Sequence, residues 1–141
     1  MTATQSRQAA RSGDRPDAAG LWAVAEALAD AAAEVTLAHF RATSLVTESK
    51  AVRFDPVTEA DRGAEAAIVE KLRALRPEDA VLGEEHGERA GTSGLTWVID
   101  PIDGTRGFIS GTPTWGTLVA LADQTGPLLG LIDQPYIGER F

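Results

Sequence analysis

The hydrophobic pattern of this chain changes once along its length, and this change restricts the folds open to it. Up to Arg76, large apolar residues recur at three- and four-residue steps, which is the spacing of amphipathic helices. After Pro77 they gather in short runs rich in Val, Leu, Ile and Trp, which are typical of strands. Two helices followed by strands predict an α+β layer rather than a strictly alternating chain of strands and helices.

Both expected helices have recognisable ends. Asp17 is placed to cap the first helix, whose apolar face should hold Leu21, Val24, Leu28, Ala32 and Val35. Thr58 precedes the second helix, and Asp61 stands three residues later, which is the spacing of a capping pair. This second helix should stop at Arg76, because the proline that follows disfavours helical backbone at the residue before it.

Four strands are expected at residues 80–83, 96–100, 115–122 and 128–132. The last two form a hairpin around residues 124–127. Residues 1–16 carry hardly any large apolar side chain, so we expect a disordered tail there. Residues 17–141 are then expected to form one folded unit.

Composition excludes several classes of function. The 141 residues include 21 acidic and 13 basic side chains, and the net charge of −8 disfavours a general nucleic-acid surface. The absence of cysteine excludes disulfide scaffolds, thiolate zinc sites and cysteine nucleophiles. We find no apolar run of membrane-spanning length and no signal peptide, so the sequence predicts a cytoplasmic protein without a membrane partner.

Acidic side chains follow two of the expected strands directly. Glu84 and Glu85 come after the first strand, and Asp100 and Asp103 come after the second. Ligands commonly bind at the carboxyl ends of strands in open sheets. Each acid taken singly suits a solvated loop or a turn equally well. Together they indicate a metal site, because converging carboxylates repel one another unless a hard cation such as Mg²⁺ lies among them.

The stretch DPIDGT at residues 100–105 is more specific than the acids alone. Its proline fixes the exit from the strand, and Gly104 permits close approach of a ligand to the backbone. Asp103 could begin a short helix running through Thr105 to Ile109, whose first amide groups favour an anion such as phosphate. A metal beside a helix N-terminus predicts a phosphate site.

Three motifs resemble the inositol monophosphatase family of Mg²⁺-dependent phosphatases. They are DPVTEAD at residues 55–61, GEEHG at 83–87 and WVIDPIDGT at 97–105, and the intervals between them agree as well. The resemblance covers about residues 21–141. It implies the N-terminal layer of a sugar-phosphatase-like αβαβα fold, in which two helices pack on an antiparallel-rich sheet and the distal half is absent.

The resemblance also implies a metal centre that binds Mg²⁺. Its ligands would be the side chains of Glu84, Asp100 and Asp103, together with the backbone carbonyl of Ile102. Lys50 would lie near the outer edge of the metal cluster.

The same resemblance also implies which residues contact the substrate and the attacking water. Gly104 and Thr105 would offer backbone amides to the phosphate, beside Asp103. Asp61 and Thr105 would orient the attacking water, and Glu84 would take part in catalysis through the metal. The implied reaction is hydrolysis of a phosphate monoester by metal-activated water, with no phosphoenzyme.

Within the family, the substrate expected is histidinol phosphate. Residues 103–111 and 132–141 look more like histidinol-phosphate phosphatases than like the inositol enzymes, in which a second threonine usually replaces Arg106. Inositol 1-phosphate is the alternative substrate. Either way the partner is a small-molecule phosphate ester and not a nucleic acid.

The family also predicts that part of the protein lies beyond this sequence. Family members are roughly twice as long, a common size for a catalytic domain of this kind, and their WDxAAG element has no counterpart here. We therefore expect a fragment, for which an inactive metal-binding module is a further alternative. The hairpin at residues 118–132 would then expose an edge and an apolar face that favour association, as in a homodimer.

Haloacid-dehalogenase phosphatases offer a different mechanism, with a covalent aspartyl-phosphate. They place the nucleophile and the acid in a DxD motif after an apolar strand. In this chain Asp100 and Asp103 are three residues apart, and no early DxD motif occurs. A phosphoenzyme is therefore not expected.

Overall fold

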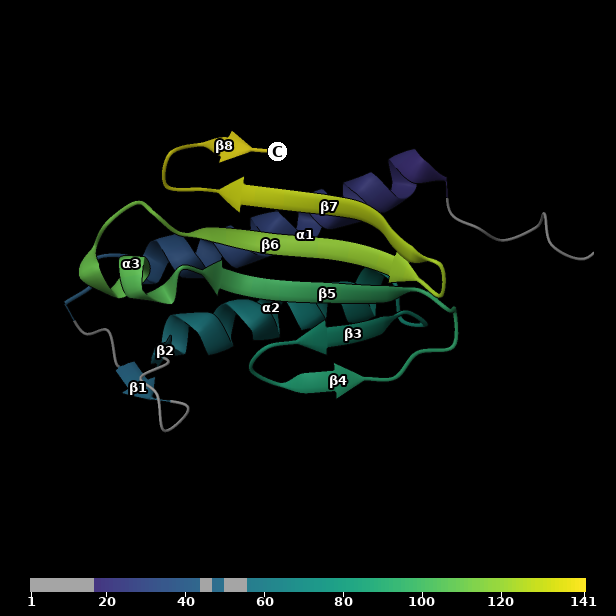
Figure 1. Ribbon diagram of the computed structural model, residues 1–141, viewed down its shortest axis with the longest axis horizontal. Helices are drawn as coiled ribbons and strands as arrows, with labels where there is room; N and C mark the ends of the chain where they lie inside the picture. The colour runs from purple at the N-terminus through teal and green to yellow at the C-terminus, as the bar shows by residue number, and fades with distance from the viewer. Residues whose placement is uncertain (1–16, 44–46, 50–55) are drawn as a thin grey trace, which may run out of the picture.

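The computed structural model describes residues 17–43, 47–49 and 56–141 (Figure 1). The helices are α1 (Ala18–His39), α2 (Glu59–Leu75) and α3 (Thr105–Ser110). The strands are β1 (Thr47–Ser49), β2 (Pro56–Thr58), β3 (Ala80–Gly83), β4 (Gly87–Arg89), β5 (Thr96–Asp103), β6 (Gly116–Asp123), β7 (Gly126–Gln134) and β8 (Glu139–Arg140).

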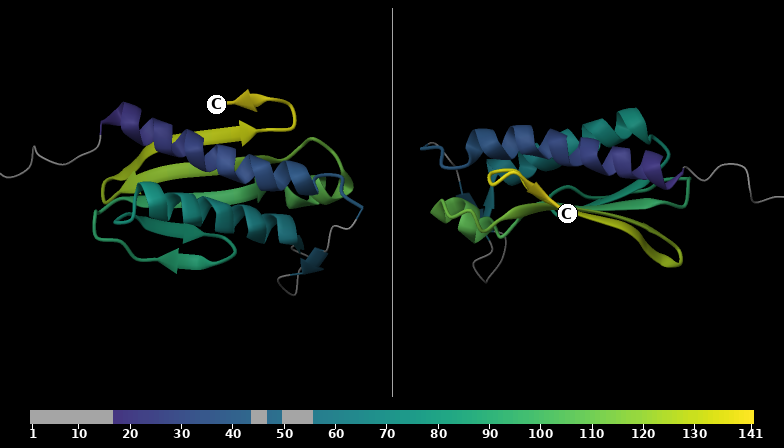
Figure 2. Two further views of the ribbon diagram at one scale, coloured as in Figure 1. Left: turned by 180° about the vertical axis from the view of Figure 1, so that it is seen from behind. Right: turned by 90° about the horizontal axis from the view of Figure 1, so that it is seen from above.

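Six strands form one mixed sheet in the order β4-β3-β5-β6-β7-β8. Only β3 and β5 run parallel, and every other neighbouring pair in this sheet is antiparallel. Helices α1 and α2 cover the same face of the sheet, and the opposite face is bare in the view from above (Figure 2). The predicted α+β layer of two helices on an antiparallel-rich sheet is therefore confirmed.

Helix α1 begins as predicted. The Asp17 side chain accepts a hydrogen bond from the amide of Gly20 at 2.7 Å, which caps the first turn. The residues that α1 buries against the sheet and α2 are Leu21, Ala25, Leu28, Ala29, Ala32 and Thr36. Val24 and Val35, which the periodicity also placed on the apolar face, are partly buried at its margin. Half of the buried set is alanine, whose small side chains let a helix approach its neighbours closely.

Helix α2 is held at its start by a complete capping box. The Thr58 hydroxyl accepts from the Asp61 amide at 3.2 Å, and the Asp61 carboxylate accepts from the Thr58 amide at 2.9 Å. The helix ends at Leu75 with Arg76 as its C-cap, one residue before the proline. Both predicted ends are confirmed.

The main strands lie where the apolar runs predicted them, although β5 and β7 are longer than predicted and β6 is shifted by one residue toward the C-terminus. The short polar strands β4 and β8 were not predicted. β8 pairs with the end of β7, where Asp133 lies opposite Arg140. β8 thus covers only the last residues of β7, and no other described strand lies on that side of β7, so the edge expected at the hairpin is open over most of its length.

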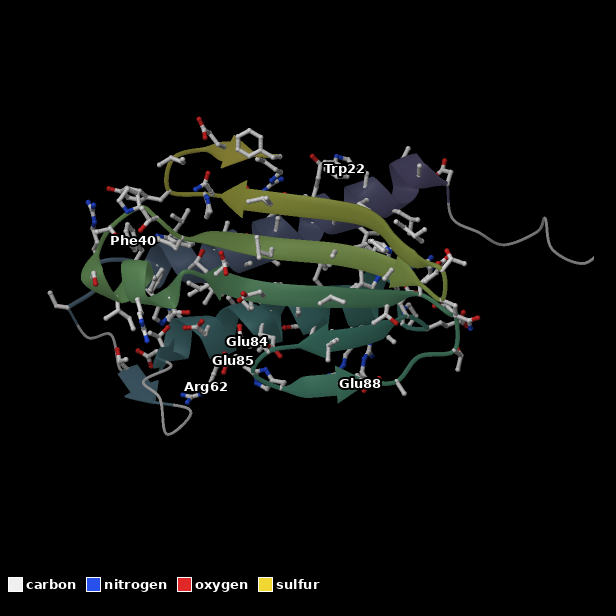
Figure 3. All side chains as sticks on the ribbon, viewed as in Figure 1. Trp22, Phe40, Arg62, Glu84, Glu85 and Glu88 are labelled. Carbon is white, nitrogen blue, oxygen red and sulfur yellow. The ribbon has the colours of Figure 1, made fainter. Side chains whose placement is uncertain are left out.

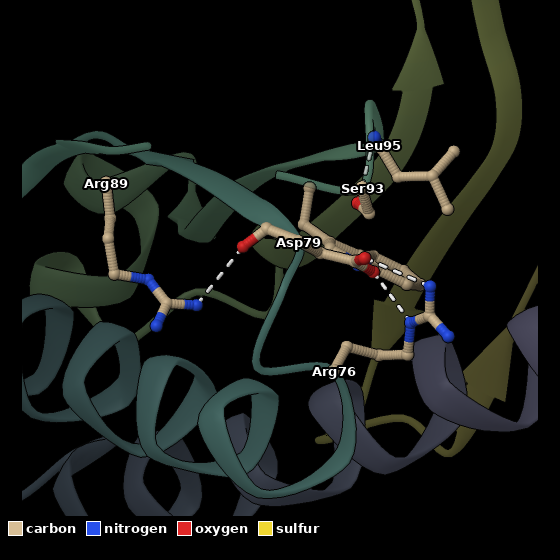
Figure 4. Close-up of polar contacts among 6 residues, drawn as sticks. Arg76, Asp79, Arg89, Ser93 and Leu95 are labelled. Carbon is tan, nitrogen blue, oxygen red and sulfur yellow. Dashed lines mark hydrogen bonds and ion pairs between the residues drawn. The ribbon is translucent and has the colours of Figure 1, made fainter. Parts of the chain in front are cut away.

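A buried carboxylate ties the end of α2 to the sheet (Figure 4). Asp79 accepts two hydrogen bonds from Arg76, at 2.8 and 3.0 Å, and one from the Trp97 indole at 2.9 Å. Burial alone would raise the pKa of Asp79, but hydrogen bonds from Arg76, Ser93 and Trp97 outweigh it and hold the pKa below its usual value. This network fixes where β3 starts beside β5.

The bare face of the sheet is apolar. Its exposed side chains include Leu82, Val98, Leu128 and Ile132. They alternate with residues such as Val81 and Trp97, which point toward the helices and are buried. The predicted apolar face is thus present. Among the described helices, none is long and apolar enough to cross a membrane.

Candidate active site

The parallel pairing of β3 and β5 brings acids from two strands together. Leu82 lies opposite Val98, and Gly83 lies opposite Ile99. Glu84 and Asp100 are the next residues along each strand, so the sheet delivers them side by side, as predicted. Figure 3 shows Glu84 at this end of β3, where the chain turns toward β4. The carboxyl group of Glu84 is hydrogen-bonded to that of Asp100.

Asp100 lies at the electrostatic centre of the site. Burial, followed by the hydrogen bond with Glu84 and the charges of Glu84, Asp103 and Asp61, raises the pKa of Asp100 to about 7. Its Oδ1 atom is buried and has no hydrogen-bond partner among the described residues. A buried acceptor without a donor, beside three further acids, is a chemical setting that suits a divalent cation.

A bulge in β5 brings Asp103 to the same site. Asp100 pairs with Leu118 and Asp103 pairs with Gly116, so three steps along β5 match two along β6. In a regular strand, residues three apart point to opposite faces. The bulge removes this alternation, and the charge of Asp103 accordingly acts on Asp100. The Thr117 hydroxyl stabilises the bulge by donating to the Pro101 carbonyl at 2.8 Å.

Asp61 and Thr105 meet across the start of α2. The Thr105 hydroxyl lies 3.4 Å from Asp61 Oδ1 and 3.0 Å from the Ile102 carbonyl. Asp61 Oδ2 accepts from the Thr58 hydroxyl at 2.6 Å as well as from the Thr58 amide. Asp61 is 2% exposed, so its carboxylate is held rigidly in the capping box while its other oxygen faces Thr105.

Gly104 links the strand to the short helix α3. Its φ of 82° is left-handed, and an added Cβ would lie 2.6 Å from the Thr114 carbonyl oxygen. Both features require glycine at this position. Behind it, the Ile102 side chain is buried with Phe108 and Trp115 in an aromatic cluster. The predicted short helix is present, but it begins at Thr105 and not at Asp103, because Asp103 is still paired in β5 and Gly104 caps the helix.

The acids of the candidate site lie near one another but do not form a complete metal site. In the described ranges, no three histidine, aspartate or glutamate side chains are arranged as a group that could hold an ion. Glu84 and Asp100 are paired through a hydrogen bond instead. Two further acids, Asp61 and Asp103, lie close enough to affect the charge of Asp100. Lys50, predicted at the outer edge of the cluster, lies outside the described residues.

Glu65, which has no role in the predicted site, lies beneath the turn after β3. Its buried carboxylate accepts hydrogen bonds from the amides of Glu85 and His86, at 2.7 and 2.8 Å. The His86 ring nitrogen Nδ1 is also 3.1 Å from Glu65. One signal was available in the sequence, because Glu65 follows Asp61 by four residues and therefore shares its helix face.

Comparison with known proteins gives one family. The model of the inositol monophosphatase family matches residues 17–141. The histidinol-phosphatase of Streptomyces coelicolor is 46% identical to this chain over 122 residues. That match covers 84% of this chain and 45% of the relative, so the chain spans less than half the length of that curated protein.

Two solved structures share the fold. The extragenic suppressor protein SuhB of Bartonella henselae superposes with a TM-score of 0.80 at 30% identity, over 86% of this chain and 47% of that one. An inositol monophosphatase from Zymomonas mobilis gives a TM-score of 0.70 at 44% identity, over 89% of this chain and 47% of that one. The structural neighbours therefore support the predicted fold for the part of it that this chain spans.

Proposed function

Because this chain belongs to the inositol monophosphatase family, whose members are metal-dependent phosphatases, we propose that it forms part of a Mg²⁺-dependent hydrolase of a phosphate monoester. The observation that carries the proposal is the Asp100 carboxyl, with a buried and unpartnered Oδ1 and with Glu84 hydrogen-bonded beside it. The substrate is a small molecule, and the enzyme acts in the cytoplasm.

Four groups of this chain would hold the metal. They are the carboxylates of Glu84, Asp100 and Asp103 and the backbone carbonyl of Ile102. When bound, Mg²⁺ would lower the pKa of a coordinated water and offset negative charge on the phosphoryl oxygens. Lys50 would lie at the outer edge of this cluster.

Asp61 and Thr105 would orient the attacking water. The Thr105 hydroxyl has two acceptors within 3.4 Å, Asp61 Oδ1 and the Ile102 carbonyl, so its proton can point to either while its oxygen faces the water. The capping box holds Asp61 in place through Thr58. The amides of Gly104 and Thr105, with Asp103 beside them, would contact the phosphate.

We propose histidinol phosphate as the substrate. Two features support it: Arg106 within DGTRGFISG, and 46% identity to a histidinol-phosphatase. Inositol 1-phosphate is the second candidate, because the chain is 44% identical to an inositol monophosphatase of known structure. A catalytically inactive, metal-binding fragment is the third, because the chain spans 45% of its histidinol-phosphatase relative.

One titration with two assays tests these proposals. Mg²⁺ is added to the 141-residue chain in a calorimeter, and phosphate release is followed from histidinol phosphate and from inositol 1-phosphate. Turnover that favours histidinol phosphate supports the first proposal, and the opposite preference replaces it with the second. Mg²⁺ binding without turnover supports the inactive fragment. A chain that binds no Mg²⁺ would overturn the metal site and with it all three.

Asp100→Asn and Glu88→Gln serve as a matched pair in this titration. Both substitutions replace a carboxylate with an amide of the same size. Glu88 is exposed on β4 and lies outside the candidate site (Figure 3). Asp100→Asn should weaken Mg²⁺ binding, whereas Glu88→Gln should leave it unchanged.

A further inference from the structure

Glu65 carries one of the few completely buried carboxylates among the described residues. It is 0% exposed, on the face of α2 that packs against the sheet. A buried charge is strongly unfavourable unless it is paired or hydrogen-bonded. Here each carboxylate oxygen accepts one backbone amide, Oε2 from Glu85 and Oε1 from His86. Consecutive amides pointing at one anion form a strong, charge-assisted pair of hydrogen bonds.

The end of β3 leaves space for this carboxylate because residue 83 is glycine. A Cβ added at Gly83 would overlap Oε1 of Glu65 and lie 2.6 Å from its Cδ. The three atoms nearest to that Cβ all belong to Glu65. Gly83 is not among the residues with positive φ, so the position requires space and not an unusual backbone. Glycine at the end of this strand is therefore coupled to the presence of Glu65.

The turn that Glu65 holds also carries Glu84. A side chain at position 83 would face the helices, where Glu65 lies. Because side chains alternate along a strand, the Glu84 side chain faces the other side of the sheet, toward Asp100. Glu65 thus lies behind the turn and acts on Glu84 through the backbone. Asp61, one helical turn earlier on the same face, contacts Thr105. Helix α2 in this way reaches both loops of the candidate site.

We infer that Glu65 is a positioning residue: its carboxylate fixes the turn at residues 84–86 and so holds Glu84 beside Asp100. The inference rests on the proposed function, because Glu84 is a proposed metal ligand. Groups that orient metal ligands typically contribute a factor of 10 to 100 in metal affinity. Removing one acceptor from the turn should therefore weaken Mg²⁺ binding even though Glu65 does not touch the ion.

The first test compares Glu65→Gln with Glu70→Gln, an exposed glutamate on the same helix. Glutamine keeps the shape of the side chain but places an NH₂ group against one of the two amides. We expect Mg²⁺ affinity to fall about tenfold in Glu65→Gln and to stay unchanged in Glu70→Gln. In the metal-free chain, the amides of Glu85 and His86 should exchange with solvent about tenfold faster in Glu65→Gln.

Exchange at the Ile68 amide, in the core of α2, separates positioning from general stability. An increase confined to residues 85 and 86 supports the inference. An equal increase at Ile68 would mean that Glu65 only stabilises the fold, and would overturn it.

A double-mutant cycle tests the contact between Gly83 and the Glu65 carboxylate by changing both partners. Gly83→Ala should displace the Glu65 carboxylate and reproduce the loss of amide protection in the turn. In a Glu65→Ala background the added methyl group meets no carboxylate, so Gly83→Ala should cause little further change. Additive effects would contradict the inference. Each single substitution disrupts this contact by itself, so if one variant does not fold, the amide exchange of the other still decides.

Failure of the proposed function gives a different result from failure of this inference. If the unaltered chain binds no Mg²⁺, the proposed function fails, and the exchange of the two amides still decides whether Glu65 holds the turn. If the unaltered chain binds Mg²⁺ and Glu65→Gln binds it equally well with unchanged exchange, the proposed function stands and the positioning role of Glu65 is overturned.

Discussion

At the scale of single residues, protons and cations compete for the Asp100 carboxyl. Its charged form is unfavourable because it is partly buried and lies near three other acids, and one of its oxygens has no donor among the described residues. Protonation of Asp100 relieves this repulsion in the metal-free chain, which is why its pKa is raised. A divalent cation would relieve it more completely, since it attracts every carboxylate at once.

Asp100→Asn removes the charge and one metal-binding oxygen while keeping the size of the side chain. In a form of the protein that hydrolyses the ester, we expect phosphate release to fall at least about 100-fold, because the metal loses a ligand. The circular dichroism spectrum should change little, and the melting temperature at pH 7 should not fall, because asparagine carries no buried charge. An Asn variant with nearly normal turnover would remove Asp100 from the metal-binding set.

The raised pKa of Asp100 predicts how the stability of the metal-free chain depends on pH. The pKa is about 7 in the folded chain and 3.8 in its ordinary state. Between these values the folded chain binds a proton that the unfolded chain has released, so the free energy of unfolding falls as the pH rises from about 4 to about 7. The pKa of Asp79 is lowered from 3.8, so Asp79 acts in the opposite direction. Its contribution to the free energy of unfolding is lost as the pH falls below 3.8.

Urea unfolding at pH 4.5 and at pH 7 measures this dependence. Asp100→Asn should flatten it over that range, since asparagine binds no proton. A variant that shows the same slope as the unaltered chain would assign the proton to another group.

At the scale of elements, the start of α2 serves both stability and the site. Thr58 is fully buried and exchanges hydrogen bonds with Asp61, which in turn faces Thr105. Thr58→Ala should lower the free energy of unfolding by about 1 to 2 kcal/mol, the usual cost of losing an N-cap hydroxyl. Thr58→Ser, which keeps the hydroxyl, should recover most of this loss. Urea unfolding of the two variants provides the comparison, and equal losses would show that the methyl group matters more than the cap.

At the scale of the whole molecule, the two faces of the sheet differ. One face is covered by α1 and α2 (Figure 2). The other exposes apolar side chains, of which Val98 is 39% and Ile132 is 48% exposed. We predict that the 141-residue chain associates through this face as its concentration rises. Sedimentation velocity from micromolar to millimolar concentration measures the association.

Val98→Thr and Ile132→Thr test whether the bare face mediates that association. Threonine keeps the β-branched shape that suits a strand but adds a hydroxyl group to the surface. Each substitution should shift the association to higher concentration, whereas Leu37→Gln, on an exposed position of α1, should not. An equal effect of Leu37→Gln would indicate general hydrophobic aggregation.

Local signals in the sequence were enough to predict much of this fold. The caps of α1 and α2, the proline that follows α2 and the apolar runs of β3, β5, β6 and β7 each depend on residues close together in the chain. The polar strands β4 and β8 carry no such signal, because they exist only through pairing with β3 and β7. The position of Glu84 directly after β3 was also readable from sequence alone, whereas Asp100 lies inside β5, which continues to Asp103.

The sequence by itself determined that Glu84 follows β3 directly and which glycines and helix caps surround the site. Only the tertiary structure decided that β3 and β5 pair in parallel, that burial raises the pKa of Asp100 to about 7, and that Glu65 reaches the turn after Gly83. These features depend on desolvation and on contacts between residues far apart in the chain. Their energies arise only when the helices and the sheet pack together, so no local pattern can encode them.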